Sequence, residues 1–119
     1  MTQLDLPVAV QQLSGEDLAV IAQLAGSWEI IGQCPTFGEW LEDVMAAEGR
    51  RRAGHNLPFP DPDVAGWSDT QVADSVCCAA MLFDATTTEQ QVEFVGELLK
   101  WFGLQAAARL KLRIVTQSN

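Results

Sequence analysis

Apolar residues in the first third of the chain recur at the interval of an α-helix. Between residues 18 and 31 they follow one another every three or four positions, which places them on one helix face. Ser14 precedes this pattern, and its hydroxyl can accept a hydrogen bond from an amide of the first turn. Gly32 and Pro35 interrupt the pattern. We therefore predict a first helix from Ser14 to Gly32, with Trp28 on its buried face.

A second helix is predicted after Pro35. Thr36 and Glu39 have the spacing of a capping box, in which each side chain binds a free backbone amide near the start of the helix. Three arginines at positions 50–52 lie where this helix should end, and positive charges there offset the negative end of the helix dipole. The apolar stripe of the helix comprises Phe37, Trp40, Leu41, Val44 and Met45.

A long loop is predicted over residues 53–67. Prolines at positions 58, 60 and 62 remove backbone donors and favour extended conformations before them. A loop of this length is uncommon in a compact domain and often takes part in binding. Leu57, Phe59 and Trp67 either anchor a partner protein or pin the loop onto the helices, and the sequence leaves both interpretations open.

Two further helices are predicted after the loop. Ser68 and Gln71 have the spacing of a second capping box, and threonines at positions 86–88 supply caps for a helix that continues to about Phe102. The predicted apolar face of the first helix comprises Val72, Val76, Cys77, Ala79 and Phe83. That of the second comprises Val92, Val95, Leu98, Leu99 and Phe102.

The two ends of the chain are ambiguous. Residues 1–12 fit a strand, an extended arm or a short helix. Residues 109–114 alternate between polar and apolar like a half-buried strand, whereas the alanines at 106–108 favour the fifth, shorter helix that we predict there. The predicted fold is mainly α: one domain over residues 1–119, with four to five amphipathic helices and a long Pro-rich loop. The alternative is an α+β fold, if the two ends form strands.

Composition points to a folded domain outside the membrane. The 119 residues are 48% hydrophobic, which is too apolar for a disordered chain despite the net charge of −9. No stretch approaches the ~18–20 apolar residues that cross a bilayer, and a secretory signal pattern is lacking. Three cysteines, two of them adjacent, suit free thiols in a reducing compartment. We therefore expect a cytoplasmic protein without membrane contact.

The charges are unevenly distributed along the chain. All 16 acidic residues lie at or before Glu97, whereas Lys100, Arg109, Lys111 and Arg113 are the only charged residues after it. The acidic surface repels nucleic-acid backbones, so direct nucleic-acid binding is not expected. The basic C-terminal segment is expected to contact an acidic face, either in the same chain or in a neighbouring subunit of a homo-oligomer.

No motif identifies an activity. The single histidine, His55, and the absence of CxxC or HxxxH spacing argue against a zinc or transition-metal site. A glycine-rich phosphate-binding motif is also absent. Cys34 or Cys78 paired with His55 would make a small thiol-dependent enzyme, but no local signature surrounds these residues. We therefore expect no catalytic residue, no cofactor and no bound metal.

The leading functional hypothesis is a non-enzymatic accessory, assembly or inhibitory factor that binds a larger partner protein. One alternative is an acidic decoy that occupies the nucleic-acid-binding site of another protein, and the other is the thiol-dependent enzyme. The residues expected to contact the partner are Leu57, Phe59, Trp67, Trp101, Arg109 and Arg113.

Overall fold

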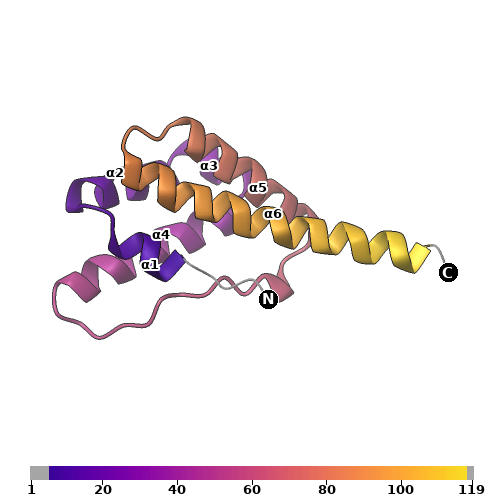
Figure 1. Ribbon diagram of the computed structural model, residues 1–119, viewed down its shortest axis with the longest axis horizontal. Helices are drawn as coiled ribbons and strands as arrows, with labels where there is room; N and C mark the ends of the chain where they lie inside the picture. Colours follow the sequence, from indigo (N-terminus) through magenta and orange to yellow (C-terminus); the bar gives the residue numbers. More distant parts are fainter. Residues whose placement is uncertain (1–5, 118–119) are drawn as a thin grey trace.

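The computed structural model describes residues 6–117, which form six α-helices, one short 3₁₀ helix and no strand (Figure 1). The mainly α prediction is confirmed, and within these residues the α+β alternative is wrong. Residues 1–5 of the ambiguous N-terminal segment lie outside the described part. The helices are α1 (Leu6–Gln11), α2 (Gly15–Ala25), α3 (Trp28–Gln33), α4 (Pro35–Arg52), η1 (Val64–Gly66, the 3₁₀ helix), α5 (Asp69–Asp84) and α6 (Glu89–Gln117).

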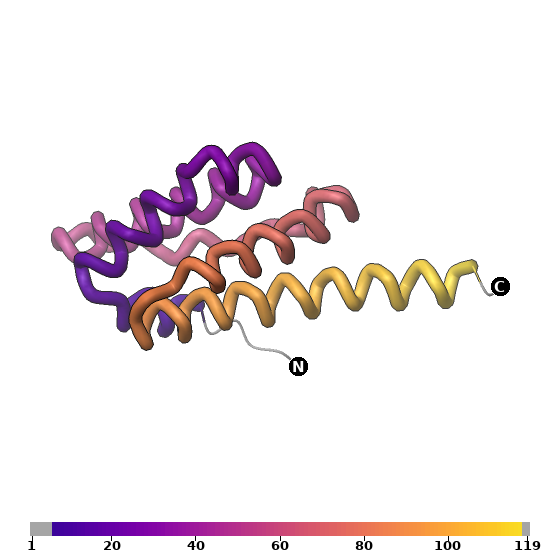
Figure 2. Tube along the Cα trace, turned by 90° about the horizontal axis from the view of Figure 1, so that it is seen from above, coloured from indigo at the N-terminus to yellow at the C-terminus, as the bar shows by residue number. Residues whose placement is uncertain are grey.

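The helices form two layers with the core between them. In one layer α2 and α3 pack on α4, and in the other α5 and α6 form an antiparallel pair (Figure 2). α3 and α4 contact α5, while α1 packs on α6. Phe37, Phe94 and Phe102 are the largest fully buried side chains between the layers.

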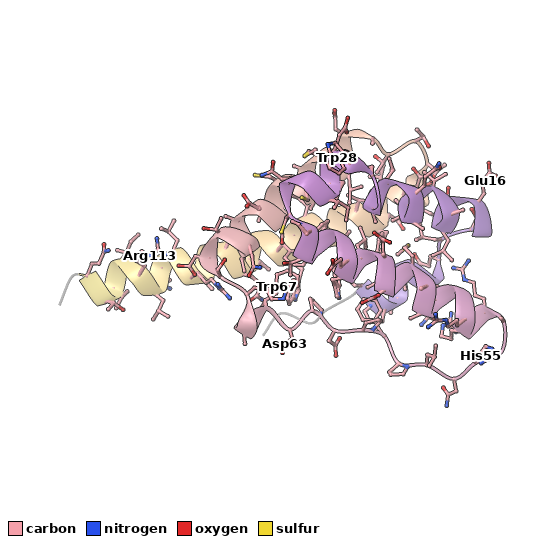
Figure 3. The ribbon with its side chains drawn as sticks, turned by 180° about the vertical axis from the view of Figure 1, so that it is seen from behind. Glu16, Trp28, His55, Asp63, Trp67 and Arg113 are labelled. Carbon is pink, nitrogen blue, oxygen red and sulfur yellow. The ribbon has the colours of Figure 1, made fainter. Side chains whose placement is uncertain are left out.

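The first predicted helix is divided in two at Gly26 and Ser27. The Ser27 hydroxyl accepts a hydrogen bond from the Ile30 amide at 3.4 Å and so starts α3 as a separate helix. The break changes the direction of the chain, and the Trp28 side chain is 85% exposed (Figure 3). The prediction that Trp28 lies on a buried face was wrong for this reason.

The start of α4 also differs from the prediction. Pro35 occupies the first turn, where its missing amide hydrogen costs no hydrogen bond, and the capping box of Thr36 with Glu39 is not formed. Instead the Thr36 hydroxyl accepts a hydrogen bond from the Gln71 side-chain amide at 2.9 Å, which ties α4 to α5. The capping box of Ser68 with Gln71 is confirmed.

The buried face of α5 is rotated from the predicted one. Cys78 and Leu82 are buried, whereas Cys77 and Phe83 are exposed, which contradicts their predicted positions. Ser75 lies within the buried face because its hydroxyl donates to the Gln71 carbonyl at 2.7 Å. Because a polar residue occupies the buried face, the apolar residues of α5 alone do not reveal that face in the sequence.

α6 is one continuous helix from Glu89 to Gln117, so the prediction of a separate fifth helix was wrong. Gly103 does not interrupt it. Alanine, leucine, lysine and arginine, which dominate positions 104–113, all have high helix propensity and favour continuation. The polar-apolar alternation at 109–114 therefore lies on a helix and does not indicate a strand.

A glycine in α4 allows this helix to pack closely against α2 and α3. Gly38 is buried, and a Cβ atom there would lie 2.5 Å from Ile31 Cδ1 and 3.1 Å from the Ala25 carbonyl oxygen. The Ile31 side chain can move, but the carbonyl belongs to the backbone of α2. Any larger residue at position 38 therefore has to push the helices apart.

We expect Gly38→Ala to lower stability and Gly49→Ala, in the same helix, to raise it. A Cβ at Gly49 meets no atom within 4 Å, so alanine adds only its better helix propensity, worth about 0.5–1 kcal/mol. Urea unfolding of both variants measures the difference, which should exceed about 1 kcal/mol. Equal effects of the two substitutions would show that α4 is not closely packed at Gly38.

Candidate functional site

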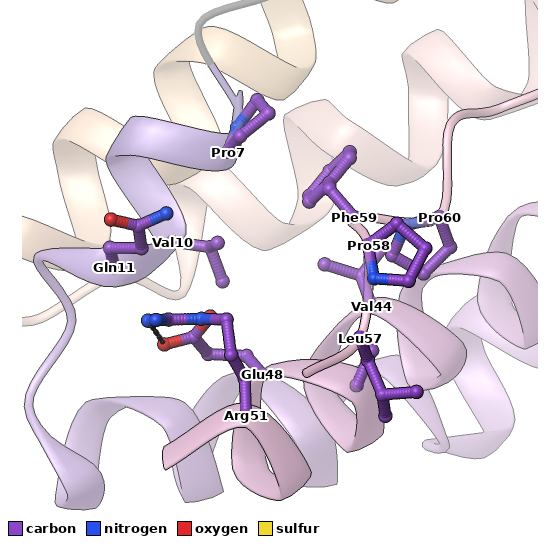
Figure 4. A pocket seen from close by; sticks show the side chains of 11 residues that line it. Pro7, Val10, Gln11, Val44, Glu48, Arg51, Leu57, Pro58, Phe59 and Pro60 are labelled. Carbon is purple, nitrogen blue, oxygen red and sulfur yellow. Dashed lines mark hydrogen bonds and ion pairs between the residues drawn. The ribbon is translucent and has the colours of Figure 1, made fainter. Parts of the chain in front are cut away.

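The predicted loop is confirmed and encloses a hollow against α1 and α4 (Figure 4). The hollow has a volume of about 160 Å³. Apolar side chains from three distant segments line it: Val10 from α1, Val44 from α4, and Leu57 and Phe59 from the loop. We call this site the loop hollow.

The loop is fixed to the bundle at several points. The Trp40 indole nitrogen donates to the Pro60 carbonyl at 2.8 Å, and Pro62 is buried. Trp67 stacks on Phe102 with 5.8 Å between ring centroids and 14° between planes. Trp67 therefore pins the end of the loop, whereas Leu57 and Phe59 are only partly buried and line the hollow.

Arg109 and Arg113 of α6 bind the end of the loop and the start of α5. Arg109 donates to the Trp67 carbonyl at 2.7 Å, to the Val64 carbonyl and to the Asp69 carboxylate at 3.0 Å. Arg113 also pairs with Asp69. The hydrogen bond from Arg109 and the charge of Arg113 lower the pKa of Asp69. These two predicted contact residues thus make their ion pairs within the chain.

Trp101 also has a contact inside the chain. Its ring meets Phe102 edge-on, with 4.9 Å between centroids, and the side chain is partly buried. The structure therefore does not bring all six expected contact residues together. It places Leu57 and Phe59 at the hollow, and Trp67, Trp101, Arg109 and Arg113 around Phe102 and η1.

A cluster of ion pairs around the buried Glu48 borders the hollow. The Glu48 carboxylate, only 5% exposed, accepts hydrogen bonds from Arg51 Nη2 and Arg52 Nε, both at 2.7 Å. Arg52 Nη2 also donates to the carbonyls of Val10 and Leu13, at 3.1 and 2.6 Å. Besides its place at the end of α4, Arg52 therefore holds the end of α1. The four-residue spacing of Glu48 and Arg52 indicates an ion pair on a helix, but the sequence prediction did not use it.

The cluster controls the ionisation of Glu48. Burial disfavours the charged carboxylate, but hydrogen bonds and charge from Arg51 and Arg52 outweigh it, so the pKa of Glu48 is lowered. The pKa is then lower in the folded than in the unfolded chain. The resulting stability is present above the unfolded pKa and is lost as the pH falls through the folded value.

We expect Glu48→Gln to lower the free energy of unfolding at neutral pH by about 1–3 kcal/mol, because it removes the charge from a carboxylate that accepts three partly buried hydrogen bonds from Arg51 and Arg52. The difference between variant and wild type in denaturant unfolding should shrink as the pH falls below the ordinary range of a glutamate, and disappear once Glu48 is protonated in the folded chain as well. Glu42→Gln, at an exposed position of α4, is the matched control and should change little. A difference that stays constant with pH would exclude the carboxylate charge as its source.

A second buried carboxylate joins α2 to α6. Asp17 Oδ1 accepts hydrogen bonds from the Gln91 side-chain amide at 2.8 Å and from the Thr88 hydroxyl at 3.1 Å. The bond from Gln91 contributes most to lowering the pKa of Asp17. Thr88 also caps α6 by accepting from the Gln91 amide, as predicted for this threonine run. The network satisfies its own polar atoms, which is what a structural role requires.

The thiols and the histidine are not brought together. Cys34 precedes α4 and His55 follows it, so an 18-residue helix about 27 Å long lies between them. Cys78 is buried in α5, and burial raises its pKa to about 12. Within residues 6–117, no group of three or more His, Cys, Asp or Glu side chains is arranged to hold a metal ion.

Thiol labelling should distinguish the three cysteines. Cys77 is exposed, whereas Cys34 and Cys78 are buried, so one thiol per chain should react rapidly at neutral pH and all three after denaturation. Cys77→Ser should remove the rapid reaction and Cys78→Ser should not. Rapid reaction of Cys78 in the folded protein would contradict the burial that raises its pKa.

Comparison with protein-family models, curated proteins and solved structures gave no match to this chain. In the described part of the chain, none of the helices combines the length and apolar composition needed to cross a bilayer. The geometry of the site is therefore the basis on which a function is proposed below.

Proposed function

We propose that this chain is a non-enzymatic protein-binding factor, of the accessory, assembly or inhibitory kind, that docks on a larger partner through the loop hollow. The size and lining of the hollow carry the proposal. Its volume of about 160 Å³ is close to that of a cavity that takes up one benzene molecule. Ligand and cofactor pockets are larger, at roughly 300–1,000 Å³. The hollow therefore suits one apolar side chain of a partner protein.

The lining specifies the chemistry of that side chain. Val10, Val44 and Phe59 offer an apolar enclosure, which favours a leucine- or phenylalanine-sized anchor. Arg51, with 41% of its side chain exposed, lines the hollow together with the Glu48 that it binds, and with Arg52 this cluster has two positive charges against one negative charge beside the anchor. An acidic residue or a backbone carbonyl next to the anchor would complement it.

The rigidity of the loop supports the proposal. Pro58 and Pro60 restrict the backbone at the hollow, and the hydrogen bond from Trp40 to the Pro60 carbonyl holds it against α4. A preformed wall loses little conformational entropy when a partner binds. The free cysteines support a cytoplasmic location for this binding.

A larger side chain that fills the hollow tests the proposal. Ala47 lines the hollow, whereas Ala46, the preceding residue of α4, is exposed. We expect Ala47→Leu to remove the partner proteins that the wild-type chain captures from its native host, and Ala46→Leu to retain them. Quantitative mass spectrometry of the captured proteins measures this, with thermal unfolding as the check on folding.

Two outcomes would contradict the proposal. Capture of the same proteins by Ala47→Leu would show that the hollow is not the docking site. Capture that falls steeply with salt would instead favour contacts between exposed charges, as in the acidic decoy, because salt screens such contacts.

A further inference from the structure

Helix α6 extends well past the two layers. It has 29 residues and a length of about 43 Å, but its last buried residue is Phe102. Figures 1 and 2 show its C-terminal part projecting beyond the other helices. We call residues 104–117 the projecting segment.

The projecting segment exposes apolar residues away from the bundle. Arg113 faces Asp69 of α5, and Leu104 lies nine positions earlier, which at 3.6 residues per turn places it on the opposite side. Leu104, Leu110 and Leu112 are 43%, 58% and 68% exposed. Leu104 is thus an exposed apolar residue on the outward side of α6, where a partner surface can cover it.

The outward side of α6 presents one line of side chains, which are charged except for Leu104 and Ala107. Its residues alternate in steps of four and three, the spacing that keeps one line of side chains facing a partner helix. All of them are exposed except Glu97, which is partly buried. This outer line consists of Glu93, Glu97, Lys100, Leu104, Ala107 and Lys111.

The charges of the outer line complement those of the same line in a second copy that runs antiparallel to it. Glu97 lies seven residues before Leu104 and Lys111 lies seven residues after it. An antiparallel second copy centred on Leu104 therefore places each Glu97 opposite a Lys111, whereas a parallel copy places like charges together. Within residues 6–117 neither Glu97 nor Lys111 forms an ion pair inside the chain.

A groove lies where the second copy would rest. It has a volume of about 230 Å³ between α1 and α6 and is lined by Val8, Ala9, Gln12, Glu93 and Glu97. Val8 is 59% exposed. The groove thus combines an apolar wall with two carboxylates, which complements a projecting segment of leucines and Lys111.

We propose that two copies of this chain form a symmetric antiparallel dimer along α6. The two helices meet at Leu104, each projecting segment lies in the α1–α6 groove of the other copy, and Lys111 pairs with Glu97 of the partner subunit. This interaction is additional to the docking function. No residue of the outer line lines the loop hollow.

Sedimentation velocity of the full chain over a range of concentrations tests the dimer. We expect Leu104→Arg to raise the dimer Kd by about thirtyfold or more, because it places two like charges at the centre of the interface. Met81→Arg, at a residue of α5 that is 38% exposed, is the matched control and should leave the dimer unchanged. Circular dichroism and thermal unfolding verify that both variants fold.

Charge exchange tests the antiparallel arrangement. Glu97→Lys and Lys111→Glu should each raise the dimer Kd by about tenfold, because like charges then meet twice in a symmetric pair. An equimolar mixture of the two variants should dimerise like the wild type, since every contact again joins opposite charges. The double variant carrying both changes should also recover.

Several results would overturn the dimer. They are a wild-type chain that stays monomeric at all concentrations, a Leu104→Arg variant that dimerises normally, and a mixture that fails to recover. If the wild-type chain is monomeric and Ala47→Leu still abolishes capture of the partner proteins, the dimer is overturned and the docking function is retained.

Discussion

The arrangement of the molecule depends on the burial of one aromatic ring, that of Phe102. Phe37 and Trp40 from α4, Trp67 from the end of the loop and Trp101 from α6 all surround it, with centroid distances of 4.9 to 5.8 Å. Aromatic pairs in such geometries add to the free energy gained by burying their area. The contacts of this one ring therefore fix the distance between the layers and hold the end of the loop against the bundle. The loop hollow forms between the loop held in this way and the helices α1 and α4.

Two buried carboxylates connect α1 and α2 to the helices that form this centre. Glu48 binds Arg51 and Arg52, and Arg52 in turn binds the carbonyls at the end of α1. Asp17 binds Gln91 and so joins α2 to α6. In both cases burial alone would favour the neutral acid, and the surrounding donors keep the pKa low. Two of the acidic side chains, Asp17 and Glu48, thus stabilise the fold from within.

The sequence predicted most helices because their starts have local chemical signals, such as the caps at Ser14 and Ser68. It failed where tertiary contacts decide between local alternatives. The break at Ser27 and the burial of Cys78 in place of Cys77 depend on which neighbours each helix meets. The loop was predictable from its prolines. The hollow was not, because its lining joins segments separated by more than thirty residues, such as Val10 and Val44.

The two halves of α6 differ in what protects their backbone hydrogen bonds. Up to Phe102 the helix is covered by the bundle, whereas none of residues 103–117 is buried. A helical segment of that length is only marginally stable on its own in water. Its amide protons should therefore exchange with solvent through local fraying, while those near Phe94 exchange only when larger parts of the bundle open. The exchange profile along this one helix consequently records which of its residues any bound protein covers.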